Sequence, residues 1–103
     1  MTIDLVVLGT AGQSPTSARN HGGYALRWGR ELVLVDPGEG AQRQLTIAHQ
    51  PPARLTRVCV THFHGDHCLG LPGVLQAHAL MNDHDRISVH YEPTQHDYVD
   101  HLL

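Results

Sequence analysis

The chain has 103 residues, the size of one ordinary domain. Hydrophobic residues make up 41% of it and charged residues 17%, which is enough apolar material for a core and too little charge for a disordered segment. The formal net charge is −3 and all seven basic residues are arginine, so the composition shows no basic surface for gripping phosphates. Ten residues are histidine, the commonest metal ligand, and their placement therefore decides whether the chain binds a metal.

Two sequence features indicate where in the cell the protein is located: its cysteine content and its N-terminal segment. Cys59 and Cys68 are too few for a disulfide framework and suit a reducing environment, so we expect packing roles for both. The apolar run near the start is too short for a signal peptide or a membrane span, and no basic segment precedes it. We therefore expect a cytoplasmic protein without a membrane segment.

Hydrophobic patterning predicts alternating strands and helices. A β-branched run predicts a strand over residues 3–8, and a polar loop follows over 13–20. A β-hairpin is predicted over 24–35, with its turn at Gly29-Arg30. The later patterns predict a helix over 41–48, a strand over 55–61, a helix over 69–81, a strand over 87–91 and a final helix from 93 to 102. This order indicates an α/β fold, with helices covering one face of a sheet.

Four potential metal ligands fall within six residues, directly after the strand predicted at 55–61. His62 and His64 are two residues apart, so on an extended segment both rings leave the same face. Gly65 permits a sharp turn, after which Asp66 and His67 lie at the start of a helix. The spacing suits two adjacent ions, one for each pair of ligands. Imidazole with carboxylate favours zinc, with manganese or iron as alternatives.

The run His62-x-His64-x-Asp66-His67 resembles the signature of the metallo-β-lactamase superfamily. Its flanks resemble more specifically the N-terminal part of ribonuclease Z, the endonuclease that trims precursor tRNA at its 3′ side. The resemblance extends from Ile3 to about Tyr91. In chain order its flanking residues are Leu8-Gly9-Thr10, Pro15, Arg19-Asn20, Asp36-x-Gly38-Glu39-Gly40-x-Gln42 and Gly70-Leu71-Pro72-Gly73.

The resemblance implies a four-layer αββα sandwich, of which this chain is the N-terminal half: a mixed sheet with helices on one face. It also implies a zinc-dependent phosphodiester hydrolase acting on precursor tRNA. His62 and His64 would hold one zinc, Asp66 and His67 the other, and Asp66 would also act as the general base. Asp36 matches the family's first motif aspartate, which supports the metal loops; the alternative role is only to end a strand.

The ligand count indicates an incomplete site. Each zinc takes four or more ligands and the chain offers about two for each ion. The resemblance places the remaining ligands, and the histidine that protonates the leaving group, in a later half. The histidines after the motif occur in no matching sequence context: His78, His84, His90, His96 and His101. We therefore expect residues 1–103 to be a truncated N-terminal portion of one domain, inactive alone and ending inside its last helix pattern. An exposed apolar sheet face would make it dimerise or self-associate.

Two departures from the family pattern keep other functions open. Ser17 stands where the family usually has lysine, and Pro37 stands where cysteine is common. The first favours an alternative within the same fold, a hydrolase of small phosphodiesters or aryl sulfates. A different class of protein is a non-catalytic metal-binding module, in which a dimer interface completes one structural zinc site.

Overall fold

The computed structural model describes residues 2–10, 22–82 and 85–103. Part of the sequence pattern used above lies outside these residues and has no structural account here. The residues concerned are Pro15, Ser17, Arg19 and Asn20 of the predicted loop, together with His84.

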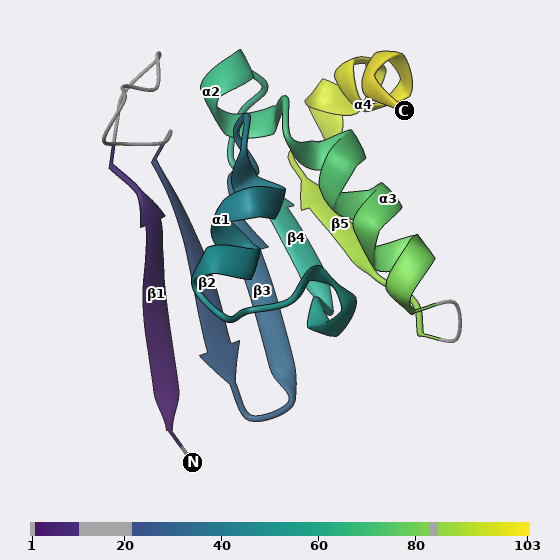
Figure 1. The fold of residues 1–103 in the computed structure, drawn as a ribbon. Helices are drawn as coiled ribbons and strands as arrows, with labels where there is room; N and C mark the ends of the chain where they lie inside the picture. Colours follow the sequence, from purple (N-terminus) through teal and green to yellow (C-terminus); the bar gives the residue numbers. More distant parts are fainter. Residues whose placement is uncertain (1, 11–21, 83–84) are drawn as a thin grey trace.

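Five strands form one mixed sheet, in the order β1-β2-β3-β4-β5 (Figure 1). Strands β1 to β3 pair antiparallel and β3 to β5 pair parallel. Gly29 has a φ of 59°, the left-handed conformation that a tight turn between β2 and β3 requires. The predicted hairpin and α/β class are confirmed. The strands are β1 Ile3–Gly9, β2 Gly23–Trp28, β3 Glu31–Val35, β4 Arg57–Val60 and β5 Ser88–Tyr91.

Helices α1 and α3 connect the parallel strands and lie on one face of the sheet (Figure 1), as expected. None of the helices in the described residues is long and apolar enough to cross a bilayer. The helices are α1 Ala41–Ile47, α2 Gly65–Cys68, α3 Leu71–Met81 and α4 His96–Leu102, and two 3-10 turns are η1 Pro52–Arg54 and η2 Pro93–Gln95.

The core lies between the sheet and these two helices. Ala25, Leu34 and Val58 are fully buried on neighbouring strands, and Leu45 of α1 and Leu71 of α3 are fully buried in the same cluster. The opposite side of the sheet, here called the open face, carries large apolar side chains that are 44–62% exposed. These are Ile3, Leu5 and Val7 of β1 with Tyr24 and Trp28 of β2. The period-2 alternation of strands accounts for this division.

Several expected boundaries were wrong. The strand expected from residue 55 begins at Arg57, and the helix expected over 93–102 is a 3-10 turn followed by α4 from His96. Two other differences lie beside the histidine run. The helix expected over 69–81 is preceded by a separate short helix, α2, and starts only at Leu71. The break follows from Gly70, whose N–H donates to the carbonyl of Pro37 at 2.8 Å. The strand expected over 55–61 ends at Val60, because the N–H of Thr61 donates to the Asp36 carboxylate.

Gly70 provides a test of this close approach. A Cβ at Gly70 would lie 2.0 Å from the carbonyl oxygen of Gly38, so Gly70→Ala must displace the Pro37–Gly38 backbone. We expect Gly70→Ala to lower the free energy of unfolding by about 3 kcal/mol, measured by urea denaturation.

Gly73→Ala, in the same segment, is the matched control. Its Cβ would lie 3.1 Å from the end of the exposed Gln42 side chain, which can move aside. Alanine is also the better helix former, so the change should be less than about 1 kcal/mol. Equal losses in the two variants would show that the close approach is unimportant.

Candidate metal centre

The candidate ligands lie where β3 and β4 end. Because these strands are parallel, their carboxyl ends meet at one edge of the sheet, which is where ligands bind in open α/β sheets. Asp36 follows β3, and Thr61 and His62 follow β4. The short helix α2, which carries Asp66 and His67, lies at the same edge (Figure 1).

Asp36 ties the two strand ends together. Its Oδ1 accepts from the backbone N–H of Thr61 at 2.7 Å, and the Thr61 hydroxyl donates to the carboxylate at 2.8 and 3.0 Å. Asp36 has a φ of 58°, a left-handed conformation that aspartate tolerates better than most residues. Its backbone N–H donates to the carbonyl of Cys59 at 2.8 Å. Asp36 thus ends β3 and also anchors the segment that begins the histidine run.

Thr61 orients the first histidine, a role that sequence reasoning missed. Its hydroxyl oxygen lies 3.1 Å from His62 Nδ1. An ionised carboxylate only accepts, so the Thr61 proton points to Asp36 and the threonine oxygen accepts from His62 Nδ1–H. This leaves the lone pair of His62 Nε2 available to a metal. The only sequence signal was a threonine at the strand end, directly before the run.

The four predicted ligands gather at this edge. The ring of His62 lies 4.7 Å from the ring of His64 and 3.9 Å from that of His67, measured between centroids. His67 Nε2 lies 3.1 Å from Asp66 Oδ2. Its other nitrogen, Nδ1, is buried and lies 3.0 Å from Asp36 Oδ2, without the alignment of a hydrogen bond. Both carboxylates are largely buried, 12% exposed for Asp36 and 13% for Asp66.

These side chains suit a divalent cation in part. Two donors that share a tetrahedral zinc at about 2.0–2.1 Å lie roughly 3.3 Å apart, close to the 3.1 Å between Asp66 Oδ2 and His67 Nε2. His67 Nδ1 is a buried ring nitrogen with no hydrogen-bond partner in the described residues. In residues 2–10, 22–82 and 85–103, however, no three or more His, Cys, Asp or Glu side chains are arranged to hold one ion. These described residues therefore offer pairs of donors rather than a full ligand set.

Phe63, which stands between His62 and His64 in the sequence, contacts aromatic residues of the C-terminal elements. Its ring stacks on Tyr98 of α4 at 5.8 Å and meets Tyr91 of β5 edge to face at 6.0 Å. A cavity of about 460 Å³ lies beside the run, and Glu92, Tyr98 and both His62 and His64 help to line it. The part that α4 plays in this cavity was not visible in the sequence.

The two cysteines do not act as ready thiolates. Burial raises the pKa of the Cys68 thiol, and the charges of Asp66 and Asp36 raise it further. Burial also raises the pKa of Cys59, with Arg57 opposing and Asp36 adding to the rise. Both thiols are therefore protonated at neutral pH, as packing roles require.

The later histidines in the described part of the chain make their contacts outside this cluster. His78 is buried on α3, at 3% exposure. His90 contacts the Ser88 hydroxyl at 2.9 Å, His96 Nε2 lies 3.5 Å from Asp100 Oδ2, and His101 Nδ1 contacts the carbonyl of Asp97 at 2.6 Å. His90, His96 and His101 are exposed.

Comparison with known proteins places this geometry in a family. The model of the metallo-beta-lactamase superfamily matches residues 24–99. A ribonuclease Z of Salinispora arenicola is 54% identical over 101 residues, which are 98% of this chain and 33% of that protein. The chain thus spans about a third of the length of such relatives, and its resemblance to ribonuclease Z is confirmed.

Two solved structures share the fold. The short form of human tRNase Z superposes with a TM-score of 0.84 at 32% identity, covering 97% of this chain and 38% of that one. The metallo-beta-lactamase fold protein YhfI of Bacillus subtilis superposes with a TM-score of 0.86 at 21% identity, covering 98% and 42%. A match of the family model over most of the sheet, the histidine run and the helices shows that the chain belongs to the metallo-beta-lactamase superfamily.

Proposed function

We propose that this chain is the metal-binding part of a zinc-dependent phosphodiester hydrolase that cleaves precursor tRNA on its 3′ side. The relatives named ribonuclease Z and the structural neighbour named tRNase Z support this proposal. Membership of the superfamily implies a divalent metal. The observation that carries the proposal is the gathering of His62, His64, Asp66 and His67 at the carboxyl end of β4. Zinc is favoured because the donors are imidazoles and a carboxylate, with manganese or iron as alternatives.

In this proposal His62 and His64 hold one ion, and Asp66 and His67 hold the other. When bound, the ions would lower the pKa of a water and neutralise charge on the phosphate in the transition state. Asp66 lies beside His67, so its carboxylate is placed to accept the proton of an attacking water as the general base. Asp36 is a positioning residue, since it fixes Thr61 and through it the ring of His62.

The remaining ligands and the general acid would come from residues beyond this chain, consistent with relatives three times as long. We propose that residues 1–103 are the N-terminal portion of one metallo-β-lactamase-type domain, which works in the cytoplasm. One sheet and one core cluster support a single domain. Two other functions remain as outcomes of the test: a hydrolase of small phosphodiesters or aryl sulfates, and a non-catalytic metal-binding module.

A chimera tests the function. We would replace the corresponding third of the Salinispora arenicola relative with this chain, which aligns over 98% of its length. The chimera should cleave precursor tRNA at its 3′ side, and Asp66→Asn should lower kcat at least about 100-fold through loss of the base. His101→Ala, on exposed α4, should leave kcat unchanged.

The other functions predict different results for this chimera. Turnover of a chromogenic phosphodiester without cleavage of precursor tRNA would show that the substrate is a small phosphodiester and not tRNA. Zinc binding without turnover of either substrate would favour the non-catalytic module.

Thr61 tests the proposed ligand geometry without an activity assay. Thr61→Val removes the hydroxyl between Asp36 and His62, while Thr61→Ser retains it. In competition titrations with a chromophoric chelator, Thr61→Val should lower zinc affinity about 10- to 100-fold, and Thr61→Ser should lower it much less. Equal zinc affinities for the valine and serine variants would show that the Thr61 hydroxyl does not orient a metal ligand.

We also propose that the isolated chain forms a homodimer through the open face. In sedimentation equilibrium the chain should have the molar mass of a dimer, because the exposed side chains of β1 and β2 form one apolar surface. Leu5→Glu, at a position 62% exposed on that face, should shift the chain to monomers. Leu80→Glu, at a position 80% exposed on α3, should not. A monomeric unmodified chain would refute this interface.

A further inference from the structure

Four of the seven arginines line one hollow of about 420 Å³, here called the arginine hollow. They come from segments far apart in the sequence: the end of β2, the β2–β3 turn, η1 and the segment before β5. The residues are Arg27, Arg30, Arg54 and Arg86. Composition showed no basic surface, and only the fold brings these side chains together.

The arginine hollow lies at the edge of the sheet opposite the metal centre. Leu32 at the start of β3 and Thr56 directly before β4 help to line it, whereas the metal centre follows the ends of the same strands. The β2–β3 turn and α2 lie at opposite ends of the molecule (Figure 1). Strands of four or five residues separate the two sites by roughly 15 Å, so the hollow is not part of the candidate catalytic site.

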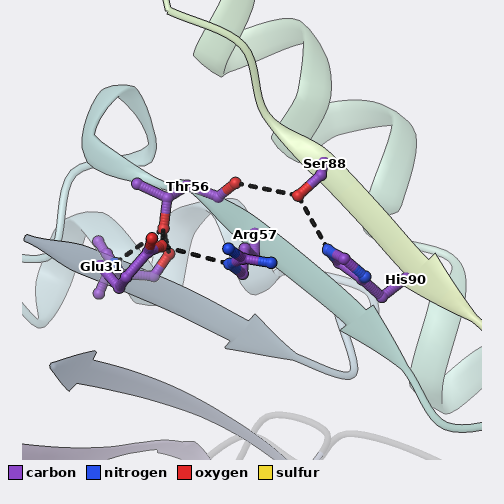
Figure 2. Close-up of polar contacts among 6 residues, drawn as sticks. Glu31, Thr56, Arg57, Ser88 and His90 are labelled. Carbon is purple, nitrogen blue, oxygen red and sulfur yellow. Dashed lines mark hydrogen bonds and ion pairs between the residues drawn. The ribbon is translucent and has the colours of Figure 1, made fainter.

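The acidic neighbours of the hollow already have partners. Glu31 accepts from the Thr56 hydroxyl and lies 3.4 Å from Arg57 Nε (Figure 2). The Thr56 and Arg57 contacts lower the pKa of the Glu31 carboxyl, although burial opposes them, so it is ionised at neutral pH. Asp85 accepts from the side-chain amide of Asn82 at 3.1 Å.

The four arginines themselves are exposed. In the described part of the chain their guanidinium groups make no hydrogen bond or ion pair with another residue, in contrast to the guanidinium of Arg57. Among the described lining residues, four guanidinium groups therefore face two carboxylates, an excess of two positive charges.

Like charges that gather in a chain of net charge −3 repel one another unless an anion lies between them. A guanidinium group donates in a planar fork that matches the oxygens of phosphate, and a doubly charged phosphate group balances the excess. Gln50, which also lines the hollow, has one side-chain amide N–H in addition to the one that it donates to the carbonyl of Ala48, and can donate it to a further oxygen. We propose that the arginine hollow binds a phosphate-bearing anion, independently of the reaction at the metal edge.

Calorimetry with the 103-residue chain tests the proposal, with excess chelator present so that no metal-bound phosphate contributes. Inorganic phosphate and pyrophosphate are the probes. Pyrophosphate should bind, and in NMR spectra it should shift the Nε–H signals of Arg54 and Arg86. A short oligoribonucleotide with and without a 5′-phosphate separates the two sources of the ligand. Tighter binding of the phosphorylated form assigns the hollow to an RNA end, and no difference assigns it to free anions.

Arginine variants distinguish a specific anion-binding site from non-specific electrostatic attraction of anions to the protein. Arg54→Gln combined with Arg86→Gln should weaken pyrophosphate binding about 100-fold, roughly ten-fold for each lost charged contact. Arg43→Gln on α1, outside the hollow, is the matched control and should change binding less than about two-fold. If circular dichroism shows that the double variant is unfolded, each single variant should give the ten-fold loss. No pyrophosphate binding, equal losses in Arg43→Gln, or shifts confined to His62–His67 would overturn the proposal.

Discussion

The carboxylate of Asp36 holds the end of β3 against the segment that follows β4. It takes the backbone N–H that Thr61 would otherwise offer to a neighbouring strand, so β4 stops and the chain turns into the histidine run. The same carboxylate accepts a hydrogen bond from the Thr61 hydroxyl, which leaves the threonine oxygen to accept from His62 Nδ1–H. It also lies 3.0 Å from His67. One side chain thus sets strand length, ring orientation and local charge at this edge.

The loop after Asp36 extends this constraint to the helices. Pro37 accepts the N–H of Gly70, and Gly70 leaves no room for a side chain against Gly38. The start of α3 is thereby fixed relative to the end of β3. Packing of Leu71 and Val74, both fully buried, continues the same contact into the core. These contacts therefore fix the positions of the elements on either side of the histidine run.

The parallel half of the sheet has chemically different ends. Histidines and carboxylates gather where β3 and β4 finish, and arginines gather where these strands begin. The two faces of the sheet differ as well, since one is covered by α1 and α3 and the other exposes apolar side chains of β1 and β2. We assign a different partner to three of these surfaces. The strand ends with histidines and carboxylates would bind a pair of cations, the arginine hollow a phosphate group, and the open face a second copy of the chain.

The sequence by itself determined the elements and the ligand run, because both are local patterns. Alternation marked the hairpin, and residues two apart placed His62 and His64 on one side. Sequence patterns did not predict the helix break at Gly70, the role of Thr61 or the arginine hollow. Each of these features brings together residues far apart in the chain: Gly70 donates to Pro37, Thr61 donates to Asp36, and Arg27 and Arg86 line one hollow. Such contacts arise only when strands pair and helices pack, so only the tertiary structure decided them.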